Sequence, residues 1–158
     1  MTKHVIIRQN PCEPNQTLIL TYSAAQNTPQ KNYYKRRQFV RNSWVKEAKD
    51  NGFKQMFVLA LPLNQSIQEN LEKESELYSD IIQFGFIDNW DNLTLKTIAI
   101  IGWIENNCLN TSYVFKTDCD TLVNVKRLKN MVNHKEFKSG ITGRQMRYRT
   151  DLIINGTS

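Results

Sequence analysis

The chain has 158 residues, of which 40% are hydrophobic, and this suits a single domain of ordinary size with a substantial core. Its formal net charge of +6 favours anionic partners such as nucleotides, but the basic residues are dispersed, which argues against a nucleic-acid-binding domain. No stretch approaches the roughly 20 apolar residues of a membrane span, and no signal peptide is visible. We therefore expect a chain that is soluble as given and meets a membrane only through an anchor outside it.

The first half of the sequence predicts two strands and two helices. We expect residues 1–16 to form an N-terminal extension, followed by a buried strand over the apolar run at 17–24. Apolar residues at helical spacing predict a helix over 32–50, which the Asp-Asn-Gly sequence at 50–52 ends. The apolar run at 53–62 predicts a second strand. Ser66 is then expected to cap a helix, with Glu69 three residues later completing a capping box.

The second half continues the alternation. Residues 79–86 and 112–118 predict a third and a fourth strand, separated by a long helix over 92–107. A helix is expected over 123–132, and short strands are possible from residue 141 onward. Strands that alternate with helices predict an α/β fold with a mainly parallel sheet flanked by helices. In such sheets, ligands bind beyond the carboxyl ends of the strands.

The segment KTDCDTLVN places two aspartates, Asp118 and Asp120, at the end of the fourth strand. Carboxylate oxygens suit Mg²⁺ or Mn²⁺, and water and substrate phosphates commonly complete the coordination of such an ion. A solvated turn, or Asp120 capping the helix that follows, is an equally simple interpretation. The pattern is common by chance, so both interpretations stay open on these residues alone.

Three cysteines, Cys12, Cys108 and Cys119, fit no zinc-binding spacing. A Cys12–Cys108 disulfide is possible in an oxidising compartment, and three reduced thiols are equally compatible with the count. Five N-x-[ST] sequons exceed the number expected from the composition and favour a secreted or lumenal setting. They begin at Asn15, Asn64, Asn92, Asn110 and Asn155.

Three blocks of sequence, in the same order, resemble the beta-1,3-galactosyltransferase and beta-1,3-N-acetylglucosaminyltransferase family of Golgi glycosyltransferases. The first is RRQFVRNSW at 36–44, which resembles the family's R-R-x-x-I-R-x-T-W. The second is ESELYSDIIQFGFIDNWDNLTLKT at 74–97, which is similar to E-x-x-x-Y-x-D-I-I…D-x-Y-x-N-L-T-x-K-T. The third is YVFKTDCDTLVNVKRL at 113–128, which resembles Y-x-x-K-x-D-D-D-x-F-V-N-x-x-x-L. The resemblance implies a GT-A-type nucleotide-sugar-binding domain, with residues 17–158 forming a partial glycosyltransferase domain that holds its donor-binding half.

The resemblance also implies roles for individual residues. Asp120 would be the ligand of Mn²⁺ or Mg²⁺, Asp118 would contact the nucleotide sugar, and Cys119 stands where the family has the middle one of three aspartates. Four further residues would contribute to the nucleotide-sugar site: Ser23, Arg37, Arg41 and Lys96.

Three of these further residues have a purely structural alternative. Ser23 can be a polar loop residue, Arg41 can pair with an acid such as Asp88, and Lys96 can pair with Asp118. The three tryptophans are expected in the core rather than as platforms for sugars: Trp44, Trp90 and Trp103.

The resemblance implies an inverting, UDP-sugar-dependent hexosyltransferase of the Golgi that forms a beta-1,3 linkage. The donor would be UDP-galactose or UDP-N-acetylglucosamine, the acceptor a glycan, and no nucleic acid would be involved. The family's E-D-V-like block, near its catalytic base, is not found, so the catalytic base is unknown. A fragment of a longer protein, an incomplete gene prediction and an inactive nucleotide-sugar-binding protein all stay open.

Overall fold

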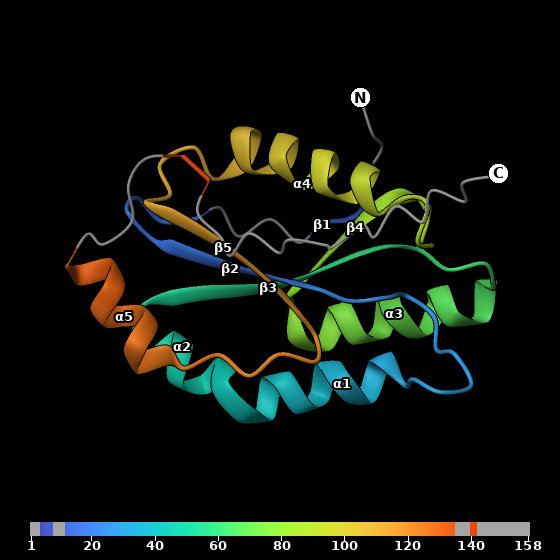
Figure 1. Cartoon of the computed structure of the whole chain (residues 1–158). Coiled ribbons are helices and arrows are strands. Elements are labelled where there is room, and N and C mark those ends of the chain that lie inside the picture. Colours follow the sequence, from blue (N-terminus) through green and yellow to red (C-terminus); the bar gives the residue numbers. More distant parts are fainter. Residues whose placement is uncertain (1–3, 8–11, 135–139, 142–158) are drawn as a thin grey trace, which may run out of the picture.

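The computed structural model of the chain describes residues 4–7, 12–134 and 140–141. A five-stranded sheet forms the middle layer, with α4 on one face and α1, α2, α3 and α5 on the other (Figure 1). The strands are β1 (His4–Ile7), β2 (Thr17–Tyr22), β3 (Phe53–Leu61), β4 (Ile81–Ile87) and β5 (Tyr113–Asp118). The helices are α1 (Tyr33–Val40), the π-helical turn η1 (Arg41–Val45), α2 (Lys46–Asp50), α3 (Gln65–Tyr78), α4 (Leu93–Asn107) and α5 (Val125–Asn133).

The sheet has the strand order β1-β4-β3-β2-β5, and its last four strands run parallel to one another. The expected α/β fold with a mainly parallel sheet is therefore confirmed. The strand β1 was not predicted: it lies in the stretch expected to be an extension and pairs antiparallel with β4. Its four residues carry too weak a pattern to be recognised without the edge of β4 beside them. The strands expected from residue 141 onward lie outside the described residues, apart from residue 141 itself.

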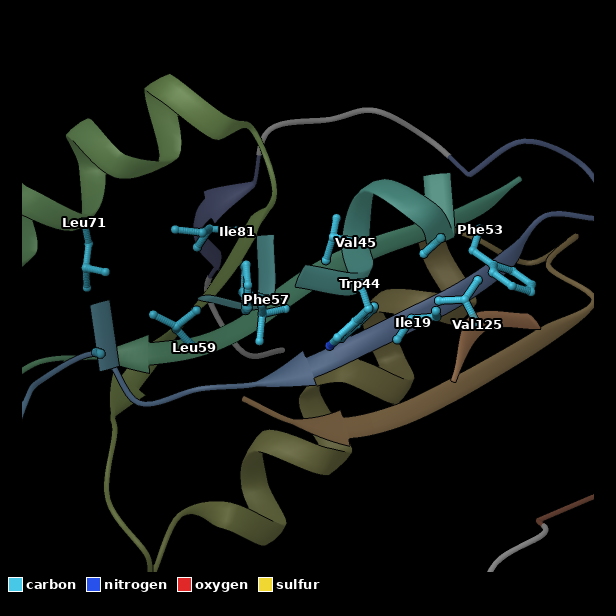
Figure 2. Close-up of a cluster of buried hydrophobic side chains, with 12 residues drawn as sticks. Ile19, Trp44, Val45, Phe53, Phe57, Leu59, Leu71, Ile81 and Val125 are labelled. Atoms are coloured by element: carbon cyan, nitrogen blue, oxygen red, sulfur yellow. The ribbon is translucent and has the colours of Figure 1, made fainter. Parts of the chain in front are cut away.

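The two faces of the sheet carry separate hydrophobic cores because successive residues of a strand point to opposite sides. On β2, Ile19 packs into the core beneath α1, η1 and α2 (Figure 2), whereas Leu18 and Leu20 pack on the face that α4 covers. All six residues of β2 are buried. A central parallel strand covered on both faces has no solvent side, so its sequence is a continuous apolar run rather than an alternating one.

The helix expected over 32–50 is present as three joined segments, α1, η1 and α2. Asn32 caps α1, since its side chain accepts a hydrogen bond of 2.9 Å from the Lys35 backbone N–H. Gly52, with φ of +79°, follows the end of α2 and suits the left-handed conformation there. The π-helical turn in the middle was not predicted, because it depends on how the helix packs rather than on a local sequence signal.

Two expected helix caps differ in the structure. Asn64, not Ser66, caps α3, because the Asn64 side chain accepts a hydrogen bond of 2.8 Å from the Ser66 backbone N–H. Asn124 caps α5 through a 2.9 Å hydrogen bond from the Arg127 N–H, so Asp120 does not cap this helix. Both choices follow the known preference for Asn at the N-cap position.

The structure also shows which cysteines form a disulfide and which tryptophans are buried. Cys12 and Cys108 form a disulfide that ties the segment before β2 to the end of α4, and Cys119 is a free, buried thiol. Two of the tryptophans are buried as expected, but Trp90 is 85% exposed, and its assignment to the core was wrong. It lies in the turn before α4, where its side chain faces solvent. None of the described helices is long and apolar enough to cross a membrane.

Candidate functional site

The ends of β2 and β5 place the first site residues next to each other. Tyr22 and Asp118 are register partners in the parallel pair, and the Cys119 N–H donates a 3.0 Å hydrogen bond to the Tyr22 carbonyl. The Ser23 N–H donates to the Val58 carbonyl of β3 at 3.2 Å. The backbone ladder therefore continues into the loops and brings Ser23 beside the Asp118–Asp120 turn. This is the carboxyl edge at which ligands of parallel sheets bind.

The turn after β5 alternates between solvent and interior. The side chains of Asp118 and Asp120 are 61% and 55% exposed, whereas Cys119 between them is 4% exposed. Lys116 Nζ donates to Asp118 Oδ1 at 3.3 Å, and Arg36 Nη1 donates to Asp120 Oδ2 at 2.8 Å. Both carboxylates thus reach solvent beside a cation.

The Cys119 side chain is buried, and the Ser23 hydroxyl and the Arg36 guanidinium lie near enough to act on its thiol electrostatically. Burial raises the pKa of this thiol, and the influence of Ser23 and Arg36, which lowers it, does not fully offset burial. The thiol is therefore protonated at neutral pH. The residue contributes no negative charge to the turn.

The donor set of this turn fits a hard divalent cation in kind. Asp118 and Asp120 supply carboxylate oxygens at the accessible edge of the sheet, which Mg²⁺ and Mn²⁺ prefer. Within the described part of the chain, no group of three or more His, Cys, Asp and Glu residues gathers as a metal site. An ion held here would need water or substrate oxygens to complete its coordination.

Arg37 of α1 and Arg41 of η1 lie in a buried ion network with two acids, one on α3 and one just before β4. Arg37 Nε and Nη2 donate to the two oxygens of Glu74 at 2.8 and 2.6 Å, and Arg41 Nη1 donates to the same carboxylate at 2.7 Å. Arg41 also forms a two-pronged pair with Asp80, at 2.8 Å for each bond. The acid partners of Arg41 are therefore Glu74 and Asp80, and not Asp88. Burial alone would raise the pKa of Glu74, but the two guanidinium groups hold it below its ordinary value.

Arg37 connects this network to the loop after β2. Its Nη1 donates to the Ser23 hydroxyl at 3.1 Å and to the Ala24 carbonyl at 3.0 Å. All three of these residues are buried or half-buried. Arg37 thus fixes the loop that borders the Asp118–Asp120 turn.

Lys96 fixes the same loop from the other side of the sheet. Its Nζ lies 2.6 Å from Asp88 Oδ1 and donates to the Ser23 carbonyl at 3.2 Å. Asp88 Oδ2 in turn accepts from the backbone N–H groups of Ala25 and Ala60, at 3.1 and 2.9 Å. Lys96 is therefore a buried lysine in an ion pair, as the structural alternative predicted. Its partner, however, is Asp88 rather than Asp118.

The structure brings Ser23, Asp118 and Asp120 to one place. Arg37 and Lys96 lie behind them and hold the backbone of the loop after β2, whereas Arg41 pairs with Glu74 and Asp80. Sequence reasoning passed over Arg36, Glu74 and Asp80, and it considered Asp88 only as a partner of Arg41. All of these residues lie within the first two of the three sequence blocks, at 36–44 and 74–97, and their place in the blocks is the signal that could have identified them.

Comparisons with known proteins show the family of the chain. The profile of the Galactosyltransferase family matches residues 35–157. Beta-1,3-galactosyltransferase 1 of mouse and of human are each 33% identical over 154 residues, which is 96% of this chain and 44% of each relative. Beta-1,3-galactosyltransferase 2 of mouse is 30% identical over 98% of this chain and 35% of its own length. This chain thus spans less than half the length of these relatives, and it belongs to the galactosyltransferase family.

Proposed function

We propose that this chain binds the donor of a UDP-sugar-dependent beta-1,3-hexosyltransferase, with UDP-galactose as the donor. The observation that carries the proposal is the pair of exposed carboxylates, Asp118 and Asp120, beside Ser23 at the carboxyl edge of the sheet. Galactose is favoured over N-acetylglucosamine because the similar proteins named above are beta-1,3-galactosyltransferases.

In this proposal Asp120 holds Mn²⁺ or Mg²⁺, and Asp118 faces the sugar. The ion, when bound, would neutralise negative charge on the departing diphosphate. Ser23, Arg37, Arg41 and Lys96 serve the nucleotide by shaping the loop on which it rests. The hydrogen bonds of Arg37 to Ser23 and Ala24, and of Lys96 to the Ser23 carbonyl, support this role. Arg41 would act through the Glu74 carboxylate that it shares with Arg37.

The reaction would be an inverting transfer, in which a carboxylate takes the proton of the acceptor hydroxyl while UDP leaves. Our proposal for this chain covers the binding of the donor and names no residue as the catalytic base. A glycan is the proposed acceptor, and the Golgi lumen is the proposed location. The Cys12–Cys108 disulfide supports a lumenal location, because disulfides persist in oxidising compartments.

The test is a calorimetric titration of UDP-galactose and UDP-N-acetylglucosamine into the folded chain, with Mn²⁺ and again with EDTA. We expect binding that requires the metal, favours UDP-galactose, and is lost in Asp120→Asn. The matched control is Asp50→Asn, which removes an exposed carboxylate at the end of α2, just before β3 begins. Equal binding by Asp120→Asn and the unaltered chain would refute the assigned metal site, and binding in EDTA would refute metal dependence.

A further inference from the structure

The exposed carboxylate of Asp120 already has a cationic partner in this structure. Arg36 reaches from α1 to the turn after β5, and its Nη1 lies 2.8 Å from Asp120 Oδ2. The guanidinium also lies over the ring of Tyr33, with Cζ 5.6 Å from the ring centroid, which favours one orientation of the side chain. A divalent cation that binds to Asp120 would therefore meet a positive charge at the same oxygen.

Position 119 offers Arg36 a thiol rather than a carboxylate. The buried Cys119 side chain precedes Asp120 and lies near the same guanidinium, but a thiol is only a weak hydrogen-bond acceptor. Arg36 is thus left with one strong acceptor in this turn, the carboxylate of Asp120. A carboxylate at position 119 would point inward to the guanidinium and offer it a partner of its own.

We propose that Cys119 diverts Arg36 onto Asp120, so that the guanidinium competes with the divalent cation for this carboxylate. Arg36 and Cys119 together then set the metal affinity of the chain and keep it low. This inference rests on the proposed metal site at Asp120. It concerns two residues that would tune the site without being ligands of the ion.

The size of the effect follows from the exposure of the pair. Ion pairs between exposed side chains are weak, so removing the competitor should tighten metal binding by about two- to fivefold. A carboxylate at position 119 should do more, about fivefold or above, because it both draws the guanidinium away and adds negative charge near the ion.

The experiment measures the Kd of Mn²⁺ alone, by calorimetry and by the electron paramagnetic resonance signal of free Mn²⁺. The variants are Arg36→Gln, Cys119→Asp, and the two combined. Lys35→Gln is the control for Arg36→Gln, since it removes an exposed positive charge one residue away on α1. Cys119→Ser is the control for Cys119→Asp, since it keeps the size of the side chain without its charge. Thermal unfolding of each variant verifies that it is folded.

We expect tighter Mn²⁺ binding in Arg36→Gln and Cys119→Asp, and no change in either control. In the combined variant, Cys119→Asp should add less than it does to the unaltered chain, because no guanidinium remains to be diverted. Full additivity would mean that the new carboxylate acts by its own charge, and it would overturn the proposal. Equal affinities in Arg36→Gln and Lys35→Gln would overturn it as well.

Failure of the metal site itself is distinguishable from these outcomes. If Asp120→Asn binds Mn²⁺ as well as the unaltered chain, or if none of the variants binds it, both the metal site and its tuning by Arg36 are wrong. If Mn²⁺ binding requires Asp120 but has the same Kd in the variants at positions 36 and 119, only the proposed effect of Arg36 and Cys119 is wrong.

Discussion

Arg36 and Arg37 are neighbours on α1, yet they belong to two different kinds of charged cluster. Arg37 is 2% exposed and joins a network with Glu74, Arg41 and Asp80, whereas Arg36 pairs with Asp120 at the solvent-exposed edge of the sheet. Consecutive helical residues point about 100° apart, so one arginine faces the interior and the other the candidate site. The ion pairs of Arg37 therefore stabilise the fold, whereas the ion pair of Arg36 lies where a ligand can reach it.

Burial makes the difference. Removing one member of a buried ion pair leaves a charge without its partner in a medium that solvates it poorly, which costs several kcal/mol. Removing one member of an exposed pair leaves a charge that water solvates, and costs little. The buried cluster should thus affect stability and the exposed cluster should affect binding.

The largest loss of stability is expected for Glu74→Gln. It leaves the guanidinium groups of Arg37 and Arg41 without their shared carboxylate and should lower the free energy of unfolding by about 3–5 kcal/mol. Urea unfolding measures this. The matched control is Glu69→Gln on the same helix, which is exposed and should change stability by less than about 0.5 kcal/mol. Equal losses of unfolding free energy in Glu74→Gln and Glu69→Gln would show that the buried cluster does not stabilise the fold more than an exposed carboxylate does.

A somewhat smaller loss is expected for Lys96→Met. Asp88 would lose its buried cation but keep the N–H groups of Ala25 and Ala60, so the cost should be about 3 kcal/mol. Lys46→Met, an exposed position on α2, is the control and should be nearly neutral. A neutral Lys96→Met would show that this pair does not support the loop after β2.

A still smaller effect is expected from acid. The pKa of Glu74 is lower in the folded chain than its ordinary value of 4.5, so the unfolded chain takes up a proton first as the pH falls. The contribution of Glu74 to stability is full above that ordinary value and is lost as the pH falls through the lower pKa of the folded state. Urea unfolding from about pH 7 to about pH 3 should show this loss, and Glu74→Gln should show a shallower acid dependence.

The smallest effect on stability is expected for Asp120→Asn. Its pair with Arg36 is exposed, so the free energy of unfolding should change by less than about 0.5 kcal/mol. Metal-dependent binding of UDP-galactose should nevertheless be lost in the same variant. Thermal unfolding and calorimetry on one preparation test both statements, and a large loss of stability would place Asp120 with the buried cluster.

Part of the candidate site could be predicted from the sequence because it depends on local pattern. The apolar run before Asp118 and Asp120 predicted a strand that ends at these residues, and a parallel sheet places strand ends at one edge. The presence of Ser23 beside that turn follows from the same rule. Neither conclusion required the identity of any partner residue.

The partners themselves could not be predicted. Arg36 and Asp120 are 84 residues apart, and Arg37 and Glu74 are 37 residues apart. Sequence reasoning offered Asp88 for Arg41 and Asp118 for Lys96, and the structure has different partners for both. A carboxylate attracts a cation from any direction, so charge alone does not select among several acids at a similar distance.

The sequence by itself determined the alternation of strands and helices, the parallel sheet and the edge at which Asp118 and Asp120 lie, since hydrophobic periodicity and strand direction are local properties of the chain. Only the tertiary structure decided that Trp90 is exposed, that β1 joins β4, and that Arg36 rather than Arg37 reaches Asp120. These features depend on which surfaces the packed elements cover. A charged group that is buried must have a partner of opposite charge, whereas a charged group at the surface is solvated by water.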